Sequence, residues 1–175
     1  MTCSRRHALV MLGGFLAAQP LPAASRAEWV RVIAMHGTAR GERTWFAPAG
    51  LAVPPGARVR FVNRDTGNSH TSTAYHPDVF DRARRIPAAA TPWDSGFLLP
   101  GEGFDVVLTA PGVYDYYCIP HEMAGMAGRI VVGTPEDPGW EDAAPASDDL
   151  PEKIAGRLPS VADIIQRGRI GEAGE

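Results

Sequence analysis

The alternation of apolar and polar residues along the chain predicts a series of short β-strands. Within residues 57–62, Val59 and Phe61 alternate with Arg58 and Arg60, the pattern of a strand that buries one face. Comparable short runs predict further strands at 28–35, 51–53, 70–75, 93–99, 103–109, 113–118 and 129–132. Turn signals rich in Pro and Gly separate these runs about every ten residues. The expected fold is therefore all-β, an antiparallel β-sandwich without crossover helices.

Two segments depart from the strand pattern. Residues 76–92 predict a long irregular loop, whose Arg82, Arg84 and Arg85 form the only local basic cluster: either a solvated loop or a docking patch for an acidic partner. The tail, residues 134–175, is rich in Pro and in acidic residues, with ten acidic and four basic side chains. It contains one predicted short helix at about 160–168, which Ser160 would cap.

Length, composition and charge narrow the class of protein. The 175 residues suit one domain of ordinary size with a segment left over, and 19 Gly and 16 Pro favour strands and turns. The net charge is −3 and no long basic block is present, which argues against a nucleic-acid binder. Residues 28–133 contain ten acidic and ten basic side chains, so the tail carries most of the imbalance.

The N-terminal residues 1–27 are predicted to be a twin-arginine-type signal peptide. The pair Arg5 and Arg6 precedes a short apolar run, and small residues allow cleavage after Ser25 or Ala27. The apolar run is short for a membrane span, although an uncleaved N-terminal anchor stays an alternative. The protein is therefore expected to be periplasmic or otherwise exported, with no stable membrane span once the signal is removed.

Removal of such a signal would leave a single cysteine. Cys3 lies within the signal, so Cys118 would be the only cysteine of the mature chain. In an oxidising compartment an unpaired thiol is a liability, and binding to a metal is the simplest reason to keep one. The alternative is a buried, inert cysteine.

The surroundings of Cys118 favour the metal. His121 and Met126 follow it within nine residues, at the end of a predicted strand and in the loop beyond. Thiolate, imidazole and thioether are ligands that copper prefers, and a second imidazole, for which His70 is the candidate, would complete a His2Cys centre with a weak axial methionine. Met123 is the rival axial ligand.

The quoted motifs resemble those of cupredoxins, the type 1 blue copper proteins. The segment Asn68–Ser69–His70, the Gly-x-Tyr strand that ends at Cys118, and the Cys-x2-His-x4-Met spacing are similar to those of the plastocyanin, pseudoazurin and halocyanin type over residues 28–133. The resemblance implies a Greek-key β-sandwich with one copper ion, bound by His70, Cys118, His121 and Met126. Plastocyanins usually have Asn at the position of Thr71, where it ties the two ligand loops together.

Three functions are weighed for such a chain. The first is a monomeric one-electron carrier that docks transiently with a donor and an acceptor redox protein; the second is a periplasmic copper chaperone or scavenger. A copper enzyme is disfavoured because only four histidines lie outside the signal. His36 is expected in a solvated turn, and His76 lies too far along the strand from His70 to share its metal. Zinc rarely accepts a Met ligand, and haem attachment would need a second Cys.

Overall fold

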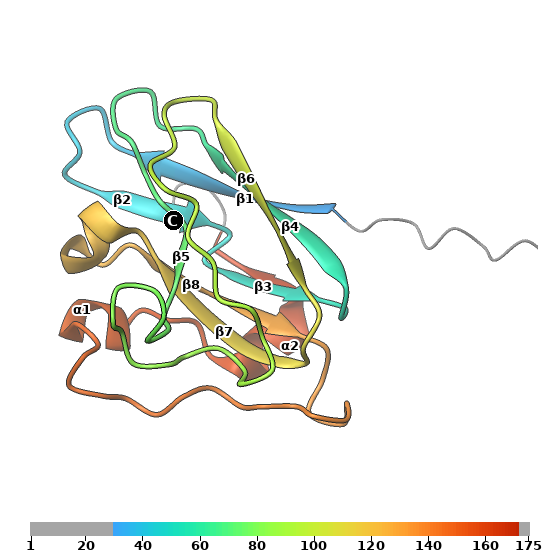
Figure 1. The fold of residues 1–175 in the computed structure, drawn as a ribbon. Coiled ribbons are helices and arrows are strands. Elements are labelled where there is room, and N and C mark those ends of the chain that lie inside the picture. The colour runs from blue at the N-terminus through green and yellow to red at the C-terminus, as the bar shows by residue number, and fades with distance from the viewer. Residues whose placement is uncertain (1–29, 172–175) are drawn as a thin grey trace, which may run out of the picture.

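The computed structural model describes residues 30–171, and in it the chain folds into two β-sheets packed face to face (Figure 1). The first sheet has the strand order β2-β1-β4-β6. Its strands are β1 (Val30–Gly37), β2 (Thr44–Ala47), β4 (Ala57–Asn63) and β6 (Gly103–Leu108). In β4 the alternation holds as predicted: Val59 and Phe61 are fully buried, whereas Arg60 is exposed.

The second sheet has the strand order β5-β7-β8-β3-β9. Its strands are β3 (Gly50–Val53), β5 (Thr73–Ala74), β7 (Gly112–Tyr117), β8 (Ala127–Val132) and β9 (Arg169–Ile170). The two-sheet sandwich predicted from the sequence is confirmed. Each sheet combines antiparallel pairs with one parallel pair, β1 with β4 and β3 with β8, so the sheets are mixed where a purely antiparallel pattern was expected.

The predicted strand at 93–99 is wrong. Its backbone forms only isolated bridges, from Asp94 to Thr73 at the edge of the second sheet and from Leu98 to His70. Gly96, with a φ of 62°, lies between the two bridges, so a continuous ladder cannot form. This segment therefore lies directly beside His70, which precedes β5 and is itself outside any strand.

Aromatic side chains fill the space between the sheets. Tyr116 of β7 meets Phe46 and Phe61 of the first sheet edge to face, with ring centroids 4.8 Å and 5.1 Å away. Cys118 and Met126 belong to the same buried cluster. Two of the four candidate ligands are therefore part of the main core itself.

The tail covers the outer face of the second sheet (Figure 1). It contains two short helices, α1 (Glu152–Ala155) and α2 (Val161–Arg167), and Ser160 caps α2 by accepting a hydrogen bond from the Asp163 N–H. Ile164 of α2 packs on Val131, and Ile154 of α1 packs beside Tyr117. Because the tail removes this face from water, all six residues of β7 are buried, where a sandwich strand normally alternates.

A buried ion-pair cluster fixes the tail to this face. Asp115 of β7 accepts hydrogen bonds from Arg85 and Arg129 at 2.7–3.0 Å. The same two guanidinium groups donate to tail carbonyls, that of Pro145 at 2.7 Å and that of Pro159 at 3.0 Å. The charges are paired and their donors satisfied, the condition under which buried charges are tolerated.

Candidate metal centre

Three of the four predicted ligands follow one another at the end of β7. Cys118 ends the strand, a 3-10 turn, η1 (Ile119–Ala124), carries His121, and Met126 precedes β8. The loop closes on itself, because the Cys118 N–H donates to the Met126 carbonyl at 3.0 Å and the Met126 N–H donates to the His121 carbonyl at 3.1 Å. Gly125 ends the turn with a φ of 95°, a conformation that favours glycine.

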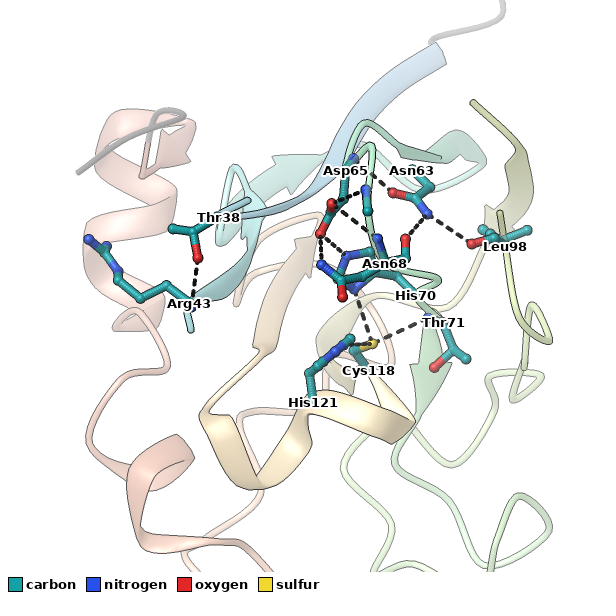
Figure 2. A network of polar contacts seen from close by, with 11 residues as sticks. Thr38, Arg43, Asn63, Asp65, Asn68, His70, Thr71, Leu98, Cys118 and His121 are labelled. Carbon is teal, nitrogen blue, oxygen red and sulfur yellow. Dashed lines mark hydrogen bonds and ion pairs between the residues drawn. The ribbon is translucent and has the colours of Figure 1, made fainter. Parts of the chain in front are cut away.

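His70 reaches the same place from the other side. Its backbone pairs with Leu98 through two hydrogen bonds, and its side chain is fully buried. The Nδ1 atom of His70 lies 3.6 Å from Sγ of Cys118, and Nδ1 of His121 lies 3.3 Å from the same sulfur (Figure 2). The two imidazole rings are 4.7 Å apart between centroids. Residues 48 positions apart in sequence thus converge on one point.

This cluster fits a metal ion. The donor atoms of His70, Cys118 and His121 all lie within 4.8 Å of one another, and it is the one such His, Cys, Asp or Glu group found within residues 30–171. Bonds of about 2.0–2.3 Å from an ion to nitrogen and sulfur ligands separate neighbouring ligand atoms by about 3.5 Å. The observed separations of 3.3 Å and 3.6 Å between the sulfur and the two nitrogens are close to that value.

The two candidate axial ligands differ in how far they are exposed to solvent. Met126 is fully buried in the core cluster that contains Cys118, whereas 74% of Met123 is exposed to solvent. Met123 belongs to the outer side of η1, and Met126 lies where the chain turns back toward the core. The structure therefore favours Met126 over Met123 as the fourth ligand.

Thr71 connects the His70 segment to the ligand loop, a role that the sequence did not predict for a threonine at this position. Its N–H donates to Sγ of Cys118 at 3.3 Å, and its Oγ1 accepts a hydrogen bond from the Ile119 N–H at 2.8 Å. The Thr71 hydroxyl also bonds that of Thr73 at 3.0 Å, which in turn donates to Asp94 at 2.7 Å. A threonine thus ties the His70 segment to the ligand loop, and its neighbours orient its hydroxyl.

Asp65 orients the ring of His70. Oδ2 of Asp65 lies 3.0 Å from Nε2 of His70, on the side of the ring away from the sulfur (Figure 2). Burial opposes the charge on Asp65, but hydrogen bonds from Gly67, Asn68 and His70 outweigh it and lower the carboxyl pKa to about 2. An ionised Asp65 accepts from Nε2–H, which leaves Nδ1 with its lone pair free to bind a metal.

The electrostatics of the cluster favour a cation. Burial raises the pKa of the Cys118 thiol to about 11, although hydrogen bonds to Thr71 and His121 act in the opposite direction. Burial also lowers the pKa of His121, with the neighbouring His70 ring acting the same way, so this imidazole is held neutral. A metal cation would supply the charge that stabilises the thiolate, and binding would release the thiol proton.

The other two described histidines stand apart from this group. His36 stacks on Trp45 with ring centroids 5.5 Å apart, and Nδ1 of His76 lies 3.6 Å from Asp78 Oδ2. Neither belongs to the metal-ligating cluster. Asp65 is a functional residue that the sequence analysis does not identify; the only signal in the sequence is a carboxylate five residues before a candidate ligand.

Comparisons with known proteins agree with this geometry. A family model described as copper binding proteins of the plastocyanin/azurin family matches residues 33–133. The fold and the site define a cupredoxin, and the chain belongs to the plastocyanin/azurin family of copper binding proteins. Copper is therefore the metal of this single site.

Individual relatives give the extent of the similarity. The chain is 39% identical over 87 residues to chloroplastic plastocyanin of Chlamydomonas reinhardtii, covering 50% of this chain and 57% of that protein. It is 35% identical over 89 residues to plastocyanin of Mercurialis perennis, covering 50% and 86%. The structure of a Sinorhizobium pseudoazurin superposes with a TM-score of 0.52 and 29% identity, covering 72% of this chain and 89% of that one. The chain thus spans little more than half of the Chlamydomonas protein.

Proposed function

We propose that the protein is a one-electron carrier, and that His70, Cys118, His121 and Met126 bind its copper ion. The observation that carries this proposal is the convergence of two imidazoles on one buried thiol in a chain of the plastocyanin/azurin family. Bound copper would supply a centre that stores and releases a single electron. The chain's own residues fix the geometry around it, so little rearrangement accompanies the change of charge.

The residues around the ligands are built for that rigidity. Thr71 joins the two ligand segments, Asp65 fixes the His70 ring, and the ligand loop closes through its own backbone hydrogen bonds. Pro120 restricts the backbone beside His121. A site that hardly moves on electron transfer has a low reorganisation cost, which suits a carrier.

Burial favours a carrier over a copper chaperone. Cys118, His70 and Met126 are fully buried, whereas a chaperone that passes on its metal needs ligands that a partner can reach. His121 is the one proposed ligand that is only half-buried. Electrons would therefore enter and leave through His121, next to the exposed Met123, when a redox partner docks there transiently.

We also propose the division of the chain. Residues 1–27 act as a twin-arginine-type signal, 28–133 form the cupredoxin domain, and 134–175 form the tail. The signal lies outside residues 30–171, which the structure describes, and within that range no helix has the length and apolar character to cross a membrane. The proposed carrier works outside the cytoplasmic membrane as a monomer, without nucleic acid.

The direct test of the function is redox cycling. The purified protein loaded with Cu(II) should accept one electron per chain from ascorbate and return it to an oxidant, with full recovery over repeated cycles. Release of copper on reduction would point to the chaperone function instead. A reaction with oxygen or another small substrate at a catalytic rate would contradict both.

A further inference from the structure

A cavity of about 530 Å³ lies beside the ligand loop. Its walls come from three parts of the chain: residues 42–46 with Ala49 around β2, Ala124, Gly125 and Ala127 at the end of the ligand loop, and the tail residues Lys153 and Arg157. Figure 1 shows β2 and α1 at the same end of the molecule. The cavity therefore exists because the tail folds back onto the copper end of the domain.

The charged side chains around the cavity are mainly cations. Arg43, Lys153 and Arg157 line it, against the single acid Glu42. Within residues 30–171, none of these three cations forms an ion pair, and Arg43 only lies over the Trp45 ring at 5.8 Å. Their charge is available to a ligand from outside the chain.

The basic cluster predicted from the sequence, Arg82, Arg84 and Arg85, differs from these cations because each of its members forms an ion pair within the chain. Arg82 pairs with Glu122 at 2.7 Å, Arg84 with Glu141 at 3.0 Å, and Arg85 with Asp115 at 3.0 Å. These arginines attach the tail and the loop, and each is paired with an acid of the same chain. By contrast, Lys153 and Arg157, which the tail brings to the cavity, form no ion pair within residues 30–171.

The cavity touches the proposed electron port. The Arg157 guanidinium lies over Gly125, so that a Cβ added there would come 3.0 Å from Nη1. Gly125 closes the turn that carries His121, and helix α1 packs against that turn. A group bound at the cavity would therefore sit beside the ligand that leads to the surface.

We propose that this cavity is the docking site for a carboxylate-rich face of the redox partner. The proposal rests on the carrier function proposed above and adds the chemistry of the partner. Unpaired Lys and Arg side chains around a concave surface attract carboxylates and raise the rate of encounter. Docking there places the partner against the His121 turn, and the attraction weakens as salt screens the charges.

Electron-transfer kinetics test the proposal with oxidants of opposite charge. The reduced protein is mixed with hexacyanoferrate(III), an anion, and separately with tris(phenanthroline)cobalt(III), a cation. Lys153→Gln/Arg157→Gln should slow the reaction with the anion roughly three- to tenfold at low ionic strength, and this effect should vanish at high salt. Arg167→Gln/Arg169→Gln removes the same charge elsewhere in the tail and should leave the rate within twofold.

A peptide titration tests docking without relying on electron transfer. Hexaglutamate is added to the isotope-labelled protein, and amide shifts should concentrate at Gly125 and Arg157 and disappear in Lys153→Gln/Arg157→Gln. Equal shifts with acetate at the same carboxylate concentration would mean a small-anion site and overturn the docking surface. An unchanged anion rate, or no peptide shifts, would overturn it too. Failure to react with either oxidant would instead refute the carrier function, while the titration still decides the docking site.

Discussion

Oδ2 of Asp65 lies 3.0 Å from Nε2 of His70, and both side chains are buried. The carboxylate of Asp65 is therefore separated from the proposed copper ion only by the imidazole ring of His70. The buried surroundings screen this negative charge poorly. Asn68 holds the carboxylate in turn, donating from its side chain to Oδ2 at 2.8 Å. A carboxylate in this position makes the imidazole a stronger donor and favours the more highly charged metal.

Asp65→Asn should therefore raise the reduction potential. Asparagine keeps the size of the side chain but removes the charge that stabilises Cu(II). A charge roughly 7 Å away at an effective dielectric constant of about 20 is worth roughly 2 kcal/mol, or on the order of 100 mV for one electron. Protein-film voltammetry measures the shift directly.

The matched control for that experiment is Asp105→Asn. Asp105 lies on β6, partly exposed, beside Arg58 and Arg60, and it is not part of the metal-ligating cluster. The same loss of charge there should move the potential by no more than about 20 mV, since solvent screens it. Equal shifts in the two variants would show that Asp65 acts only through the overall charge.

Thr71→Val should loosen the ligand loop. Valine matches threonine in shape but leaves the partly buried Ile119 N–H without its acceptor, which costs about 1–3 kcal/mol. The free energy of unfolding, measured in guanidinium chloride on the metal-free protein, should fall by that amount. Thr71→Ser keeps the hydroxyl and should retain most of the stability, so a serine variant as unstable as the valine variant would contradict the assigned role.

Substitution at the two methionines distinguishes the axial ligands. Met126→Leu should change the copper EPR parameters and raise the reduction potential, because it replaces a buried thioether with a hydrocarbon. Met123→Leu should leave both unchanged, since that side chain is 74% exposed. The opposite pattern would make Met123 the ligand.

Acid should detach the tail from the ligand loop. Arg82 bonds both Glu122 in that loop and Asp149 in the tail. A hydrogen bond from the Ala83 N–H, together with Arg82, lowers the pKa of Asp149 in the folded state. Its contribution to tail attachment is therefore complete above its ordinary pKa, near 4, and is lost as the pH falls through the lower, folded value.

Hydrogen exchange of the Ile154 and Ile164 amides measures that detachment. Their opening should become faster below about pH 4 in the unchanged protein. In Asp149→Asn the opening should be faster already at neutral pH, and its increase in acid should be smaller. Equal acid responses in the two proteins would show that Asp149 is not the responsible group.

The sequence predicts some parts of this molecule better than others. Cys118, His121 and Met126 are close in the chain, so their spacing alone indicates the ligand loop. Thr71 meets Ile119 across 48 positions, and such a contact depends on how two segments pack, which no local pattern encodes. Ligand chemistry makes His70 the candidate for the second imidazole, but no local pattern shows that its ring reaches Cys118 across 48 positions.

The same reasoning explains the errors in the strands. Residues 93–99 have the composition of a strand, but their Gly96 turns the chain and leaves single bridges. The two-residue β9 is too short to show a periodicity. No sequence pattern predicts how the tail attaches, because its apolar residues are few and its charge excess does not indicate that buried arginines will donate to its carbonyls.

The optical and EPR spectra of the purified protein after addition of Cu(II) test the central claim most directly. A single copper ion bound by the Cys118 thiolate, with imidazoles from His70 and His121, should give an intense visible thiolate-to-copper band and a narrow copper hyperfine splitting. Both should disappear in Cys118→Ser and bleach reversibly with a reductant. A pale spectrum typical of tetragonal copper, the same in the wild-type protein and in Cys118→Ser, would contradict the account.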